Sequence, residues 1–121
     1  MTNKNIVDKF FDRWSRGDLD GAMDMCTDDV VWDNIPMKPI AGKAAISAFL
    51  GKFATGMSDI HYEVKGSMEN ADSLMLEGTE NYTKNGRKVS VPYMASFKFR
   101  DGKICAWSDY FDLKTVERQL A

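Results

Sequence analysis

KVSVPYMASFKFRDGKICAWSDYFD, residues 88–112, holds two runs of alternating apolar and polar side chains joined by Asp101-Gly102. Such alternation is typical of β-strands, because successive side chains of a strand point to opposite faces of the sheet. The dipeptides Asn85-Gly86 and Asp101-Gly102 each precede one run, and both supply the positive φ angles that tight hairpin turns require. This stretch therefore predicts two antiparallel strands, at about 88–100 and 103–112.

The alternating pattern continues toward the N-terminus. Ile60, Tyr62 and Val64 alternate with polar residues, and a further run covers about 72–83. Four strands in series, joined by short turns, predict an antiparallel meander.

Upstream of Gly56 the apolar residues fall at helical spacing. A first helix is expected between Thr2 and Arg16, a short second helix after Asp18 that includes Cys26, and a third after Gly42. Asp28-Asp29 should break the second helix into a short strand, Val30–Trp32, and two prolines make the following stretch a loop. Leu113 to Leu120 could form a brief terminal helix.

Helices followed by a curved antiparallel sheet predict a single soluble α+β domain over residues 1–121. The three N-terminal helices should pack on the concave face of a sheet formed by the last four strands. The opposite face of the sheet would then be exposed to solvent unless another molecule packs on it. Because Leu74, Leu76 and Val89 are available there, we expect a homodimer packed sheet to sheet.

Composition excludes several classes of partner. The 16 basic and 18 acidic residues are scattered and give a formal net charge of −2, which argues against nucleic-acid binding. Cys26 and Cys105 lack the spacing of zinc or redox sites, and we expect both to be buried, reduced thiols. No apolar run approaches the roughly 18 residues of a membrane span, and no signal peptide begins the chain. A cytoplasmic protein is expected, with no membrane partner.

The order of elements resembles the superfamily that contains ketosteroid isomerase, SnoaL-type cyclases and limonene epoxide hydrolase. The residues that carry the resemblance are Gly17-Asp-Leu-Asp-Gly21, Asp28-Asp29 and Gly102–Asp112, and the closest branch is SnoaL-like and limonene epoxide hydrolase-like. The resemblance implies a cone-shaped α+β barrel around one hydrophobic pocket for a small molecule. It further implies that Asp109 is the catalytic base, and it matches Trp32 and Asn34 to a water-positioning aromatic residue and an Asn.

Two departures from these relatives concern their catalytic groups. Aligning Ser73–Tyr82 puts Thr79 where the epoxide hydrolases have an Arg and Asn81 where they have the proton-donating Asp, so the hydrolase triad is incomplete. Measured against ketosteroid isomerase, three other residues replace the Tyr donor, the Asp base and the protonated Asp: Phe10, Asn34 and Ala95.

The residues themselves favour Asp109 as a candidate acid or base. Alternation places it on one face with Trp107 and Phe111, and apolar surroundings raise the pKa of a carboxyl toward neutrality. Asp109 could equally bind a neighbouring strand. Asn34 and Asn81 are amides that could orient a water or a substrate oxygen, although Asn34 could simply form a turn.

Aromatic residues supply the expected pocket wall, in which Tyr93 offers a hydroxyl or, alternatively, lies at an edge with that hydroxyl in water. His61, the one histidine, alternates with apolar residues and should lie on the polar face. We expect neither a metal nor a cofactor. The expected substrate-binding residues are Phe10, Trp14, Trp32, Tyr93, Trp107 and Phe111.

The sequence therefore predicts an enzyme performing acid–base chemistry on a small apolar or polycyclic molecule. Asp109 would be general base or acid, assisted by Asn34 and Asn81. Hydrolysis, isomerisation, dehydration and cyclisation all remain open. The alternative is a non-catalytic small-molecule-binding protein of the same fold.

Overall fold

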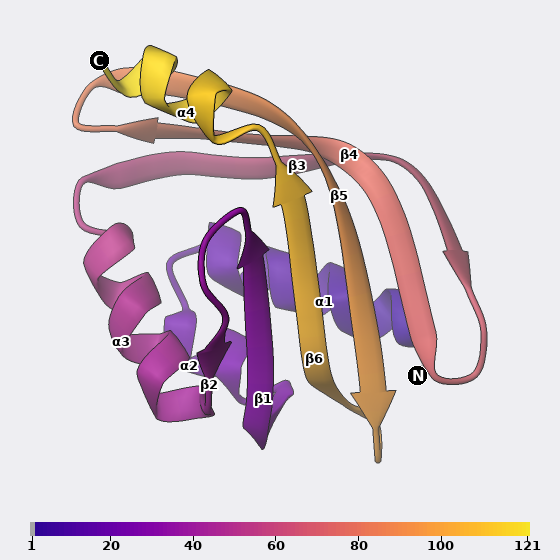
Figure 1. Ribbon diagram of the computed structural model, residues 1–121. Coiled ribbons are helices and arrows are strands. Elements are labelled where there is room, and N and C mark those ends of the chain that lie inside the picture. The colour runs from indigo at the N-terminus through magenta and orange to yellow at the C-terminus, as the bar shows by residue number, and fades with distance from the viewer. Residues whose placement is uncertain (1) are drawn as a thin grey trace.

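The predicted antiparallel meander is confirmed by the computed structural model, which describes residues 2–121 (Figure 1). Both hairpin turns use the residues expected. Asn85 and Asp101 have φ angles of 51° and 53°, and a glycine with positive φ follows each. The four strands of the meander are β3 (Met57–Glu69), β4 (Ser73–Lys84), β5 (Arg87–Arg100) and β6 (Lys103–Phe111).

A strand from the N-terminal half completes the sheet. β1 (Cys26–Ile35) pairs parallel with β6, so that Trp32 lies opposite Trp107 and Asn34 opposite Asp109. The two-residue β2 (Ile40–Ala41) pairs antiparallel with β1, which gives the order β2-β1-β6-β5-β4-β3. The expectation of a sheet formed only by the last four strands, all antiparallel, is therefore wrong. β2 and β3 remain as free edges, so the sheet curves without closing into a barrel.

The early start of β1 explains the difference. Cys26 begins this strand instead of ending the second helix, and the strand continues through Asp28 and Asp29. Both acidic side chains point to solvent, where they form ion pairs with Lys43 and Arg100. The pairing of β1 with β6 is irregular between Cys26 and Val31, which leaves both adjacent acids exposed, and alternation then buries Val30 and Trp32.

The N-terminal helices lie against the concave face of the sheet. Figure 1 shows the long strands β3 to β5 bending around the helices. The last helix, α4, lies over the C-terminal end of β4 and the N-terminal end of β5. Thr2 caps the first helix by accepting from the backbone N–H of Asn5 at 3.1 Å, and Gly17, with a φ of 80°, follows its end. The helices are α1 (Asn3–Ser15), α2 (Leu19–Met23), α3 (Lys43–Phe53) and α4 (Leu113–Leu120).

Leu74, Leu76 and Val89 are buried inside the molecule, so the expectation that they lie on the outer face is wrong. They share the inward phase of their strands with Tyr82 and Phe97. The exposed apolar side chains that face outward from the sheet in the described chain are Val31, Met68, Met75, Met94 and Tyr110. A homodimer packed sheet to sheet stays a prediction.

The two cysteines differ in environment. Cys26 is fully buried, and burial raises its pKa to about 12. Cys105 is only half-buried, so that part of the expectation is wrong, because alternation along β6 gives the inward position to Ile104. No helix within residues 2–121 is both long enough and apolar enough to cross a membrane.

Candidate active site

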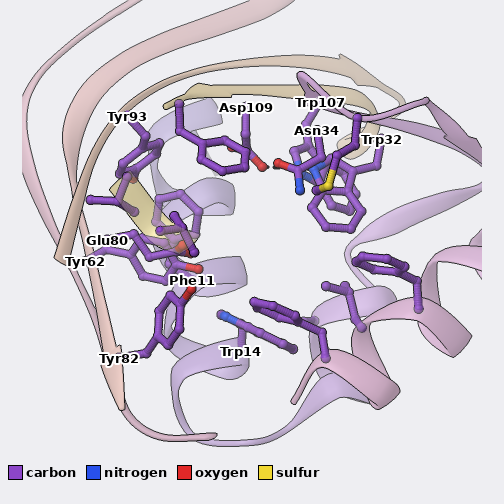
Figure 2. A pocket seen from close by; sticks show the side chains of 18 of the residues that line it. Phe11, Trp14, Trp32, Asn34, Tyr62, Glu80, Tyr82, Tyr93, Trp107 and Asp109 are labelled. Carbon is purple, nitrogen blue, oxygen red and sulfur yellow. Dashed lines mark hydrogen bonds between the residues drawn. The ribbon is translucent and has the colours of Figure 1, made fainter. Parts of the chain in front are cut away.

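A cavity of about 360 Å³ lies between the helices and the concave face of the sheet. Its volume falls within the range of small-molecule sites. Figure 2 shows rings on most sides, contributed by α1, α3 and the strands. The aromatic residues that line it, including all six expected from the sequence, are Phe10, Phe11, Trp14, Trp32, Phe49, Phe53, Tyr62, Tyr82, Tyr93, Trp107 and Phe111.

Asp109 projects from β6 into this cavity between aromatic rings. Trp32 Nε1 donates a hydrogen bond of 2.9 Å to Oδ2 of Asp109, and the indole of Trp107 also donates toward the carboxyl. The side chain is exposed only partly, toward the cavity. Loss of hydration raises the pKa of Asp109 to about 6, although both indoles favour the charged form and hold the pKa lower than burial alone would.

Asn34 lies on β1 opposite Asp109 and lines the same part of the cavity (Figure 2). Its amide can donate to and accept from a group placed next to the carboxyl. Tyr93 also lines the cavity, and its buried hydroxyl finds no hydrogen-bond partner among residues 2–121. Burial raises the pKa of Tyr93 well above its ordinary value, so the hydroxyl stays protonated and available as a donor.

Glu80 is a second buried carboxyl in the cavity, and the sequence interpretation missed it. It lies on β4, and Figure 2 shows it beside Tyr62, across the cavity from Asn34. Desolvation raises its pKa to about 7, the Tyr62 hydroxyl beside it lowers the pKa, and the charge of Asp109 raises it further. The signal was present in the alternation of Leu74, Leu76 and Tyr82, which places even-numbered residues of this strand inward.

Asn81 does not line the cavity, so its predicted role there is wrong. Odd-numbered residues of β4 face away from the helices, and Asn81 lies between His61 on β3 and Ser90 on β5. Its Nδ2 is buried without a hydrogen-bond partner in the described part of the chain. Thr79 shares this outward phase, so neither residue takes the place of a catalytic group.

Gly78 shares the inward phase of Glu80 on β4 but does not line the cavity, and there is no room for an Arg side chain at this position. A Cβ at this glycine would collide with the backbone carbonyl of Glu63 on β3, where the pairing of the two strands shifts register. Any side chain at this position would push the strands apart.

The charged side chains that line the cavity are all acidic, while the nearby ammonium of Lys84 lies 4.6 Å from the ring centroid of the lining residue Phe53. Glu117, an exposed residue of α4, joins Asp109 and Glu80 in the wall, and none of the lining residues in the described chain is Lys, Arg or His. His61 lies on β3 outside the cavity, with Nδ1 3.1 Å from the carbonyl of Asp59. Within residues 2–121 no three metal-ligating side chains gather in one place.

Comparison with known families agrees with this architecture. The profile of the SnoaL-like domain matches residues 7–107, which is most of the chain. The chain belongs to the SnoaL-like family.

Solved structures share the fold of this SnoaL-like domain. A candidate polyketide cyclase of Pseudomonas putida is 24% identical, with 100% of this chain and 99% of that chain covered at a TM-score of 0.86. An NTF2-like protein of unknown function from Burkholderia pseudomallei is 21% identical, with 100% of this chain and 99% of that chain covered, at a TM-score of 0.88. An LEH-like epoxide hydrolase of M. tuberculosis is 22% identical, with 96% of this chain and 90% of that chain covered, at a TM-score of 0.83. At these identities the likeness shows the fold alone.

The two carboxyls of this SnoaL-like domain can hold different protonation states at one pH. Loss of hydration raises the pKa of both carboxyls toward neutrality, but hydrogen bonds from the indoles favour the charged form of Asp109, and the charge of Asp109 in turn disfavours ionisation of Glu80. These contacts favour a carboxylate at Asp109 together with a carboxylic acid at Glu80. Environments that separate two pKa values in this way let one group accept a proton while the other donates.

Proposed function

We propose that this domain is an acid–base enzyme that moves protons on a small, uncharged, apolar molecule without a cofactor. Asp109 is the general base and Glu80 the general acid. The observation that carries the proposal is that both carboxyls line one aromatic cavity, where loss of hydration raises both pKa values toward neutrality and the Trp32 hydrogen bond favours the charged form of Asp109 alone.

The chemistry that suits this pair is proton removal next to a carbonyl group. The Asp109 carboxylate takes the proton of the C–H bond, whose electron pair forms a C=C bond, while the carbonyl π pair takes the proton of Glu80 to give an enol. In an isomerisation, Asp109 returns its proton to a different carbon and Glu80 recovers its own from the enol oxygen. Both carboxyls then regain their starting states, so no further reactant is needed.

The surrounding residues support these roles. The Trp32 hydrogen bond fixes the orientation of the Asp109 carboxyl, and Asn34 beside it can hold a substrate oxygen or a water. The unpaired hydroxyl of Tyr93 can donate to the developing oxyanion. The same donors would assist the aldol-type ring closure of a polyketide-like chain, which also begins with an enol. The fold that this domain shares with the candidate polyketide cyclase of Pseudomonas putida is consistent with that reaction.

Proton exchange tests the proposal without knowledge of the natural substrate. Enones and phenolic polyketide-like ketones are incubated with the protein in D₂O, and exchange of the C–H protons next to the carbonyl is followed by NMR. Epoxides are incubated in parallel, and opening of the epoxide ring is followed. We expect exchange in ketones that bind. Asp109→Asn should reduce the rate by about 10²–10⁴-fold and Glu80→Gln by a smaller factor.

Glu77→Gln is the matched control, because this residue lies on the same strand as Glu80 but faces away from the cavity. Its rates should equal those of the unaltered protein. Tight binding of ketones with no exchange in any of them would contradict the proposal and favour the non-catalytic binding protein. Rapid opening of epoxides that survives Glu80→Gln would show instead that hydrolysis proceeds without this acid.

A further inference from the structure

The cavity extends beyond the two carboxyls into a space bounded by α4. Here the lining residues belong to a second hydrophobic cluster, separate from the main core and formed by the ends of α3, β4 and β5. The name tail subsite is used below for the part of the cavity lined by Phe53, Tyr82, Val91, Val116 and Leu120.

The position of α4 over this space follows from its sequence and from an unpaired strand edge. Leu113, Val116 and Leu120 recur at helical spacing and line the cavity, and Val116 is only 8% exposed. On the neighbouring strand, pairing of β5 with β6 begins only at Tyr93, so the edge of β5 before that residue has no strand partner on this side.

Gln119 fills that gap. Its Oε1 accepts from the backbone N–H of Ser90 at 2.8 Å, and its Nε2 donates to the carbonyl of Ser90 at 2.9 Å. The amide side chain thus satisfies both groups of one residue, as a neighbouring strand would. The two bonds fix α4 against the strand, which makes the helix a defined wall of the cavity.

The chemistry of this wall selects an uncharged group. None of the five side chains of the tail subsite is charged, and removal of an unpaired charge from water into such surroundings is strongly unfavourable. Two charged groups lie beside the subsite: Glu117, on the exposed side of α4, and the ammonium of Lys84, 4.6 Å from the Phe53 ring centroid. Because Lys84 already donates to the carbonyls of Phe53 and Thr55 and does not line the cavity, exclusion of a charged group rests on the loss of its hydration. The helix also lies outside residues 7–107, the part of the chain that matches the family profile.

We propose that the tail subsite holds an uncharged, apolar chain or ring of the substrate, while Asp109 and Glu80 act on the oxygenated end. The substrate class is thus an elongated ketone with an apolar tail and no carboxylate at its far end. The location of the reacting end rests on the proposed function, but the apolar subsite does not. Val116 and Leu120 set the length of tail that fits.

Binding of a homologous series tests this directly. Methyl ketones from hexanone to dodecanone are titrated against the protein by calorimetry. Affinity should rise roughly fourfold with each methylene that becomes buried, until the subsite is full. Keto acids of equal length, which carry a carboxylate at the end of the chain far from the ketone, should bind at least tenfold more weakly above neutral pH. Equal affinity for ketones and acids would overturn the selection against anions.

Two substitutions test whether the ketone tail binds under α4. Val116→Trp fills the subsite, so the gain in affinity should stop at a shorter ketone, whereas Leu120→Ala should move the limit to a longer one. Lys114→Trp adds the same indole to an exposed position of the same helix and should leave the length limit unchanged. If Val116→Trp and Lys114→Trp have the same length limit, or if Leu120→Ala does not extend the limit to a longer ketone, the tail does not lie under α4.

The same titrations with Asp109→Asn separate this inference from the proposed function. A preserved length limit in that variant, together with absent proton exchange in the unaltered protein, would reject the catalytic proposal and keep the subsite. A shorter length limit in Val116→Trp but not in Lys114→Trp, together with proton exchange by the unaltered protein, is the result expected when both proposals hold.

Discussion

Trp32 Nε1 donates a 2.9 Å hydrogen bond to Oδ2 of Asp109, which joins residues that are 77 positions apart in the chain. The parallel pairing of β1 with β6 produces this contact, because it places Trp32 beside Trp107 and close to Asp109. The same pairing stacks the two indoles, with ring centroids 5.4 Å apart. One indole therefore both orients the carboxyl and covers it from water.

Replacement of Trp32 by Phe tests what the indole N–H does. The substitution keeps an aromatic ring against Trp107 but removes a donor that favours the charged form of Asp109. We expect the pKa of Asp109 to rise above about 6 and the free energy of unfolding to fall by about 1–2 kcal/mol. Carboxyl ¹³C shifts followed against pH, together with denaturant unfolding, measure both. An unchanged pKa would mean that the bond does not act on the ionised carboxyl.

The rate of proton exchange should depend on pH in a bell shape. The base must be ionised and the acid protonated, so the rate should rise as pH passes about 6 and fall as pH passes about 7. Rates for a ketone substrate, measured from pH 5 to 9 as kcat/KM, give the two limbs. In Glu80→Gln the residual activity should lose the upper limb. A profile that keeps rising above pH 8 would exclude Glu80 as the acid.

Asp109→Asn should stabilise the protein near pH 7. The folded pKa of about 6 is raised above the unfolded value of about 4, so the unfolded chain loses its proton first and stability falls as pH rises between these values. The penalty is complete above pH 6 and, softened by water in the cavity, amounts to about 1–3 kcal/mol. Asn avoids it and still accepts from Trp32.

Thermal unfolding of the two proteins from pH 4 to 8 measures this difference. The gain from Asp109→Asn should be small at pH 4 and largest at pH 7, while Glu77→Gln should show no such trend. A loss of stability at pH 7 would instead identify the Asp109 carboxylate as a structural hydrogen-bond acceptor.

Gly78→Ala should destabilise the protein although it adds only one methyl group. The new Cβ would meet the carbonyl of Glu63, and separation of two paired strands costs about 1–3 kcal/mol. Gly66→Ala on β3 is the control, since no heavy atom lies within 4 Å of a Cβ there. Urea unfolding of both variants makes the comparison. Equal stability would show that the strands yield easily, and that an Arg at this position could be accommodated.

The local pattern of the sequence was sufficient for one half of the candidate site. Period two along residues 103–112 puts Trp107, Asp109 and Phe111 on one face, and this holds because alternation in a strand depends only on its own backbone. The helices, the hairpin turns and the meander followed for the same reason. Each is encoded by residues that are close together in the chain.

The strand that carries Glu80 shows where such reasoning failed. A shift of one residue exchanges the two faces of a strand, and matching Asn81 to an acid of related proteins selected the outward face. Leu74, Leu76 and Tyr82 belong to the opposite phase and are buried, so burial of apolar surface fixes Glu80 inside. The apolar residues of the strand were the better guide to its orientation.

Sequence alone thus determined the order of the helices, the hairpin turns, the four strands of the meander and the inward position of Asp109, because these depend on short-range periodicity and turn chemistry. Only the tertiary structure decided that β1 runs parallel to β6, that Glu80 shares a cavity with Asp109, and that α4 forms part of its wall. Both acids lie on strands that flank β5, and the curvature of the whole sheet turns them toward one space. Their raised pKa values follow from the exclusion of water by helices distant in sequence, which no local pattern encodes.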